Sequence, residues 1–194
     1  VEIAIDERLT KWRPSYFSDS MEQNDQAIWR MGDPGEILAA KREDEAARET
    51  LLRYHRPSFE DGVFAYEFFH EPGAVAVAPA LDRMALILSD DAVKVHWITD
   101  GSFDRTGLAT DNLQEEPGLR VGQGALPLKA GDWNRMELVI AGDTVEARLN
   151  GETIARRAIE PTNQRHLGLF RFRDWPTAKV RKTSSIWTAP SPAP

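Results

Sequence analysis

The stretch WNRMELVIAGDTVEARLNGETIARRAI, residues 133–159, has the clearest structural pattern in the sequence. Its first segment alternates apolar and polar residues, and Val145, Ala147 and Leu149 repeat the alternation after AGDT. A period of two is typical of strands with one buried face. Asn150–Gly151 then suits a type I′ turn, because both residues tolerate positive φ. The stretch therefore predicts three antiparallel strands in a meander.

A second alternating segment, GVFAYEFFH (residues 62–70), precedes this meander. Phe64, Tyr66 and Phe68 share one face, and Glu67 lies on the other face among further apolar residues. A strand with apolar groups on both faces is typical of the middle of a sheet in a two-layer structure. We therefore expect a central strand here.

Shorter patterns predict further strands and turns elsewhere in the chain. The GDPG segment (residues 32–35) favours a turn between two short strands, and residues 43–52 could form a short helix before the strand-like LLRYHRP. SDDA is expected to form the turn between RMALILS and AVKVHWI. Further alternation predicts a strand in HLGLFRF, and KVRKTSSIW (residues 179–187) is expected to close a sheet edge.

The strand count predicts an all-β protein. Roughly ten to thirteen short strands with turn residues between them favour a β-sandwich or jelly roll. Residues 1–187 are expected to form a single domain, and the proline-rich residues 188–194 are expected to be a disordered tail or a linker. Val1 in place of an initiator methionine suggests a processed protein or a piece of a larger one.

Composition excludes several classes of function. Lys and Arg number 24 against 31 Asp and Glu, a net charge of -7, and no basic stripe suggests nucleic acid. No apolar run approaches the ~20 residues needed for membrane insertion. The absence of cysteine excludes disulfides, thiolate catalysis and cysteine-ligated metals. The four histidines lack any metal-binding spacing.

Several motifs occur in a recognisable order: GEI (35–37), RP (56–57), DGVFAYEFF (61–69), GDWNR (131–135) and EPTNQR (160–165). This order resembles the concanavalin-A-like, laminin-G-like jelly rolls, and in particular an uncharacterised bacterial domain-of-unknown-function family (DUF1583-like). It is more distantly similar to the 3-keto-disaccharide hydrolase domain family. The resemblance implies a jelly-roll β-sandwich of two antiparallel sheets with little helix.

The family resemblance brings no established activity, but the motif order and the polar residues at positions where this fold usually binds ligands suggest a function. We expect a carbohydrate-binding or accessory module of a larger polysaccharide-processing protein, secreted or in the cell envelope. Its partners would be carbohydrate and other domains of the parent protein. One alternative is a glycoside hydrolase or keto-disaccharide hydrolase, and another is a structural or protein-interaction domain without a small-molecule ligand.

Glu67 is the best catalytic candidate. It could act as a general acid or base, or accept hydrogen bonds from sugar hydroxyls near Phe69 and His96, or simply face water. Retaining glucanases of this fold carry an E-x-D-x-x-E strand. Here Glu71 shares the strand parity of Glu67, but no Asp lies between them.

The segment HWITDGSFDRTGLATDN (residues 96–112) could form a ligand-binding loop. Its acidic residues Asp100, Asp104 and Asp111 have near-EF-hand spacing, but Arg105 occupies the position of the required glycine. The alternatives are a looser calcium site, which would be the only cofactor, and a plain Asx-rich loop. Asp104 and Arg105 could also contact a ligand directly.

Six tryptophans could stack on sugars or fill the core. Trp175, in FRDWPTA, falls between two predicted strands and is the best candidate for an exposed platform. The predicted ligand-binding set is thus Glu67, Phe69, His96, Asp104, Arg105 and Trp175.

Overall fold

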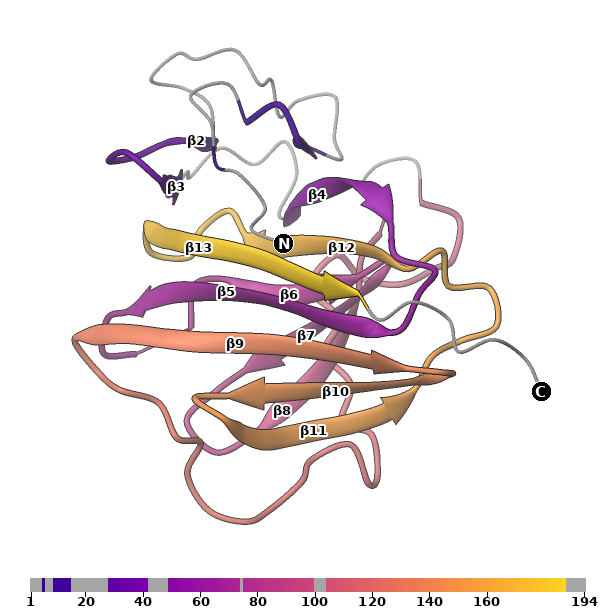
Figure 1. The fold of residues 1–194 in the computed structure, drawn as a ribbon. Helices are drawn as coiled ribbons and strands as arrows, with labels where there is room; N and C mark the ends of the chain where they lie inside the picture. Colours follow the sequence, from indigo (N-terminus) through magenta and orange to yellow (C-terminus); the bar gives the residue numbers. More distant parts are fainter. Residues whose placement is uncertain are drawn as a thin grey trace.

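The computed structural model describes residues 5, 9–14, 28–41, 49–73, 75–99 and 104–187, which form two stacked antiparallel sheets (Figure 1). This arrangement confirms the predicted all-β jelly-roll sandwich. The described residues include no helix, and so none that could span a membrane.

Thirteen strands make up the described part of the sandwich. The six-stranded sheet contains, in spatial order, β1 (Trp12–Pro14), β4 (Glu49–Pro57), β12 (His166–Phe172), β6 (Ala78–Leu81), β7 (Met84–Leu88) and β8 (Val93–Trp97). The seven-stranded sheet contains β11 (Glu152–Ala158), β10 (Thr144–Leu149), β9 (Asp132–Ala141), β5 (Gly62–His70), β13 (Ala178–Trp187), β3 (Glu36–Ala39) and β2 (Trp29–Met31).

The predicted meander is present as β9, β10 and β11. Asn150 and Gly151 both have positive φ, 50° and 89°, as the predicted turn between β10 and β11 requires. β5 pairs with β9 on one side and β13 on the other, which confirms its central position. Local alternation and turn chemistry were sufficient to predict these four elements.

Two expectations about strands were wrong. β13 lies in the interior of its sheet, between β5 and β3, and not at an edge. The turn at residues 32–35 does join two short strands, and one of them, β3, supplies the additional partner of β13. The helix expected over residues 43–52 is contradicted by β4, which begins at Glu49; residues 42–48 lie outside the described part of the chain.

The main core lies between the two sheets. Phe64, Tyr66 and Phe68 of β5 are almost completely buried there, and so are the alternate residues Met136 and Leu138 of the neighbouring β9. Burying an aromatic or large aliphatic side chain of this kind stabilises a fold by roughly 1.5–3 kcal/mol. The polar residues between them necessarily face outward.

The six-stranded sheet is apolar on both faces. Leu52 and Leu169 belong to the main core, whereas their neighbours Leu51 and Phe170 belong to a second cluster on the opposite face. Phe172 extends this second cluster. Strands covered on both sides lose the simple alternation of apolar and polar residues. A large part of this sheet is therefore buried on both faces.

We predict that Gly168→Ala destabilises the protein by about 1–3 kcal/mol, the usual cost of overpacking a core. A Cβ at Gly168 would lie 2.6 Å from Leu51 Cδ1 and 3.2 Å from the Leu52 carbonyl oxygen. Gly32→Ala is the control, because its Cβ would meet no atom closer than 3.5 Å. Urea unfolding measures both variants. Equal stability of the two would contradict the prediction.

Candidate functional site

An aromatic pair lies on the outer face of the seven-stranded sheet. Phe69 of β5 and Trp133 of β9 are opposite each other in register. Their ring centroids are 5.6 Å apart with an interplanar angle of 77°, an edge-to-face contact. Both side chains are half-buried. Because such a contact restrains both rings, it holds apolar surface in a defined orientation at the protein surface.

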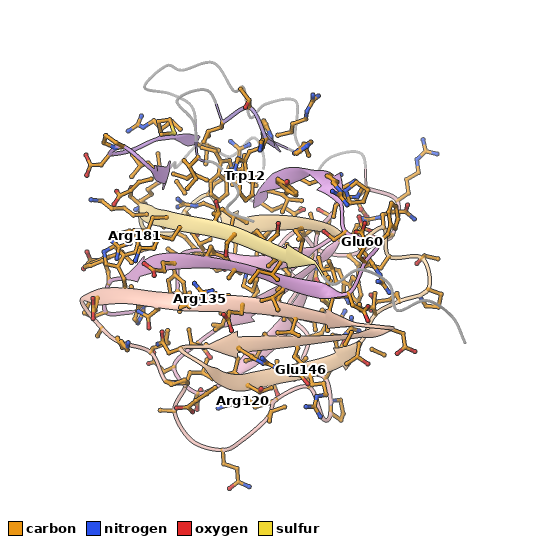
Figure 2. The ribbon with its side chains drawn as sticks, viewed as in Figure 1. Trp12, Glu60, Arg120, Arg135, Glu146 and Arg181 are labelled. Atoms are coloured by element: carbon orange, nitrogen blue, oxygen red, sulfur yellow. The ribbon has the colours of Figure 1, made fainter. Side chains whose placement is uncertain are left out.

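Arg181 of β13 covers the Trp133 ring. Its guanidinium carbon lies 3.8 Å from the ring centroid, within the range of a cation–π contact. Arg181 Nε donates to Glu67 Oε2 at 2.8 Å, and the two residues are register partners. Figure 2 shows Arg181 on the same sheet as Arg135 of β9. Glu67 thus holds Arg181, and Arg181 holds the indole of Trp133.

A β-bulge brings a second cation to Glu67. The register of β13 against β5 shifts between Arg181 and Ser184, and Lys182 has a φ of 49°. Consecutive residues of a regular strand point to opposite faces, but a bulge can re-aim a side chain. Lys182 Nζ therefore donates to Glu67 Oε1 at 3.1 Å, on the same side as Arg181.

These two cations determine the charge state of Glu67. Partial burial raises the pKa of its carboxyl group, but the hydrogen bonds and positive charges of Arg181 and Lys182 outweigh burial and leave the pKa below its ordinary value. The carboxylate is therefore ionised near neutral pH. An ionised carboxylate can accept hydrogen bonds or a proton, but it is a poor general acid.

A depression of about 460 Å³ opens beside the aromatic pair. It lies where β9, β5, β13 and β3 run side by side. Two carboxylates, an ammonium group and a hydroxyl group surround the two aromatic rings. We call it the Phe69–Trp133 depression, and its lining residues are Glu36, Phe69, Glu71, Trp133, Thr177 and Lys179.

Of the residues predicted to bind ligand, only Phe69 lines this depression, and Glu67 lies beside it through Arg181 and Trp133. In the sequence, Trp133 is one of six tryptophans, and no local pattern marks Glu36 as a site residue. Their proximity to Phe69 depends on the strand register, which the local sequence does not contain. The one local signal is that Glu71 lies two residues after Phe69, which predicts that both side chains lie on the same face of the sheet.

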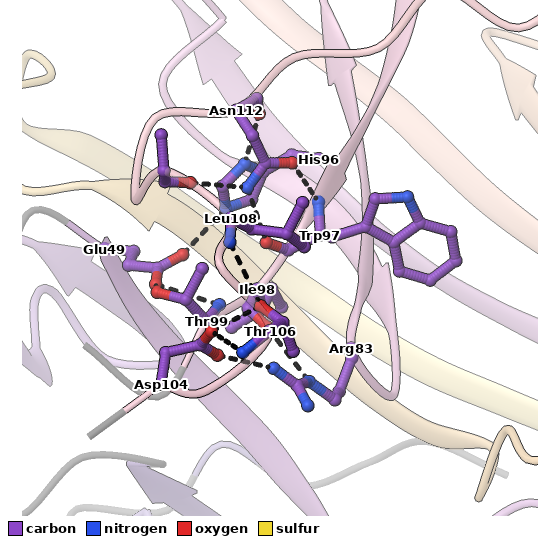
Figure 3. Close-up of polar contacts among 11 residues, drawn as sticks. Glu49, Arg83, His96, Trp97, Ile98, Thr99, Asp104, Thr106, Leu108 and Asn112 are labelled. Carbon is purple, nitrogen blue, oxygen red and sulfur yellow. Dashed lines mark hydrogen bonds and ion pairs between the residues drawn. The ribbon is translucent and has the colours of Figure 1, made fainter. Parts of the chain in front are cut away.

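His96 is completely buried on the outer side of the six-stranded sheet (Figure 3). Its Nδ1 lies 2.6 Å from the carbonyl oxygen of Asn112, and its Nε2 lies 2.7 Å from Glu49 Oε2. The other Glu49 oxygen accepts from the Thr99 amide at 2.9 Å. These bonds tie β4 and β8 to the segment that follows β8. His96 is therefore in the interior, on a different sheet from Glu67.

The partners of His96 determine where its protons lie. A carbonyl oxygen can only accept, so Nδ1 carries a proton and donates to Asn112. Nε2 and Glu49 Oε2 form a second hydrogen bond of 2.7 Å, and both side chains are completely buried. A buried pair of this kind is tolerated, but the loss of one partner leaves the other without compensation.

Asp104 is ordered by contacts with its own loop and with the β6–β7 turn. Its Oδ2 accepts from Arg83 Nη2 at 3.0 Å, and its Oδ1 accepts from the Thr106 amide at 2.7 Å (Figure 3). Arg105 and Asp111 are exposed, and Asp100 lies outside the described residues. Among the residues that the structure describes, no three acidic or histidine side chains form a metal site. Calcium binding by this loop stays a prediction.

Trp175 is half-buried between β12 and β13. Its ring contacts Phe172 edge-to-face at 5.0 Å, so it extends the second apolar cluster. The structure thus distributes the predicted residues over three places: Glu67 and Phe69 on one sheet, His96 and Trp175 on the other, and the Asp104 loop beside it. Ligand contacts by Trp175 stay a prediction.

Known proteins share the fold. The family model described as "Domain of unknown function (DUF1583_N)" matches residues 43–188. No protein of curated function matches the sequence. A candidate glycosyl hydrolase from Parabacteroides distasonis is 14% identical over 94% of this chain and 91% of that chain, with a TM-score of 0.58.

Two further solved structures are similar. The carbohydrate-binding module CBM66 from Bacillus subtilis is 12% identical over 91% of this chain and 95% of that chain, with a TM-score of 0.53. A sialidase is 8% identical, and the match covers 93% of this chain but 17% of that chain, with a TM-score of 0.53. At these identities the likeness establishes the fold.

We predict that Glu49→Ala destabilises the protein by about 3–5 kcal/mol, because it leaves Nε2 of the buried His96 without its partner. Glu49→Gln should cost less, since an amide still offers a donor and an acceptor. Glu115→Ala is the control and should have no measurable effect, because Glu115 is exposed. Urea unfolding compares the variants. A Glu49→Ala protein as stable as the control would contradict this account.

We also predict a pH-dependent contribution from Glu67. Because its folded pKa is lowered, its stabilising effect is complete above the unfolded-state pKa of about 4.3 and is lost as the pH falls through the folded value. Wild type should exceed Glu67→Gln by at most about 1 kcal/mol at neutral pH and by less at pH about 3. Urea unfolding at both pH values tests this. A difference that grows on acidification would refute it.

Proposed function

Because the chain belongs to the DUF1583_N family and has a jelly-roll fold, we propose that it is a carbohydrate-binding module. Its ligand lies in the Phe69–Trp133 depression. The observation that carries this proposal is the restrained aromatic pair bordered by Glu36, Glu71 and Lys179. Rings held beside hydrogen-bonding groups match a ligand with apolar faces and polar edges.

A sugar ring has this combination of surfaces. Its C–H faces pack on aromatic rings, and its hydroxyl groups both donate and accept hydrogen bonds. In the depression, the carboxylates of Glu36 and Glu71 accept from hydroxyls, Lys179 donates, and Thr177 does either. Orientation by a few polar groups on an apolar surface is typical of small-molecule sites.

Hydrolysis is the alternative. A glycoside hydrolase needs a carboxylic acid that protonates the leaving oxygen, and this acid usually has a raised pKa. Glu67 has a lowered pKa and is held by two cations. Binding without cleavage is therefore better supported than catalysis with Glu67 as the acid/base. If no sugar binds, the remaining alternative is a protein-interaction domain.

We propose a role within a larger, secreted or cell-envelope polysaccharide-processing protein. The match to 17% of a much longer sialidase chain supports this, because the fold occurs there as one part of a larger protein. Nucleic acid is a poor fit for the outer face of the seven-stranded sheet. Several cations on this face pair with carboxylates, as Arg135 does with Glu137 and Arg148 does with Glu146.

A glycan array followed by calorimetry tests the proposal. We expect wild type to bind at least one glycan, and Phe69→Ala and Trp133→Ala to weaken that binding at least about tenfold, which corresponds to 1.4 kcal/mol. Phe59→Ala is the matched control. It removes an aromatic side chain that is 69% exposed and lies outside the depression, so binding should not change.

Three results would contradict this proposal. An array without hits favours the protein-interaction alternative, and equal binding by all variants moves the site elsewhere. The third result would be cleavage of the bound oligosaccharide, which chromatography after incubation detects. If wild type cleaves the sugar and Glu67→Gln does not, the protein is a hydrolase with Glu67 in its mechanism.

A further inference from the structure

A second depression, of about 350 Å³, lies at a corner of the six-stranded sheet. The β6–β7 turn, the end of β8, residues 106–108 and the β11–β12 connection form its walls. It shares no lining residue with the Phe69–Trp133 depression. The groups that give it chemical character are Asp82, Arg83, Trp97, Leu108, Glu160 and Thr162.

One wall is held in place by Arg83 and Asp104. Arg83 Nε donates to the Ile98 carbonyl oxygen at 3.0 Å, and its Nη2 donates to Asp104 Oδ2 at 3.0 Å (Figure 3). Asp104, only 6% exposed, also accepts from the Thr106 amide. Because these bonds are made between groups of the protein itself, the wall needs little ordering when a ligand binds.

Trp97 forms the apolar wall and is restrained in a similar way. Its Nε1 donates to Gln114 Oε1 at 3.3 Å. The guanidinium carbon of Arg157 lies 5.4 Å from the ring centroid, and Arg157 pairs with Glu116 at 3.0 Å and also with Glu160. Trp97 thus presents a fixed, half-buried ring next to Leu108.

The polar groups here still have hydrogen-bonding capacity. No described residue accepts from Arg83 Nη1, and Asp82 uses one carboxylate oxygen for the Gln164 amide. Thr162 adds an exposed hydroxyl group. The free donor and acceptors therefore surround a fixed aromatic ring.

From this arrangement we propose a second carbohydrate-binding site at the Trp97 corner, for a neutral sugar of one or two residues. A volume near the low end of the usual 300–1,000 Å³ for ligand sites requires a small ligand. Trp97 and Leu108 pack against its C–H face, while Arg83 and Thr162 bind its hydroxyls. Asp82 and Glu160 outnumber Arg83 in charge, so the site disfavours uronates.

The two depressions have no lining residue in common. Either site can therefore bind alone. If both bind neighbouring sugars of one polysaccharide, the second contact becomes intramolecular and overall affinity rises without new interactions.

Indole N–H signals in ¹⁵N NMR spectra test the Trp97 site. Trp97→Phe and Trp133→Phe assign the two signals, and methyl glycosides of glucose, mannose, galactose and fructose are titrated up to tens of millimolar. We expect at least one glycoside to shift the Trp97 signal saturably. Arg83→Gln should weaken that binding at least tenfold and Thr162→Val severalfold.

Thr162→Val keeps the test valid if Arg83→Gln disturbs the loop, since Thr162 is exposed and its hydroxyl group makes no hydrogen bond with the described residues of the wall. A saturable shift of Trp97 alone supports this site and contradicts the first. The Trp97 site is overturned if only the Trp133 signal shifts or if neither signal shifts. It is also overturned if the Trp97 signal shifts but both variants bind the glycoside with the affinity of wild type.

Discussion

The alternation of side chains along β5 sets both the core and the outer surface of the seven-stranded sheet. Because Phe64 and Phe68 must enter the core, Glu67 and Phe69 must lie on the opposite face. Pairing with β9 and β13 on either side then adds Trp133 next to Phe69. The burial of Phe64 and Phe68 thus places Phe69 and Trp133, the aromatic pair of the first candidate site, on the outer face of the sheet.

The same local arrangement of tryptophan, arginine and carboxylate occurs beside both depressions. Arg181 covers Trp133, and Arg157 lies over Trp97. In each case carboxylates hold the arginine, so the ring and the cation restrain each other. A ring that is already immobile loses little conformational entropy when a ligand packs on it, which favours binding at a small site.

The six-stranded sheet shows where strand parity misleads. His96 points away from the main core, as its alternation with Val95 predicts, but that direction leads into a second buried layer and not to solvent. In this buried layer, Glu49 pairs with the His96 imidazole. Parity gives the face of a sheet to which a side chain belongs, and what covers that face is decided by segments distant in the sequence.

The strands of the meander, the Asn150–Gly151 turn and the sandwich class can be predicted from the sequence, because pleating and turn dihedral angles are local properties of the backbone. Three features depend on contacts between distant segments: β13 is central, Trp133 lies against Phe69, and Glu49 meets His96 across 47 positions. Strand order and register are set by the total apolar surface buried between distant segments. This total cannot be estimated from any short stretch of sequence.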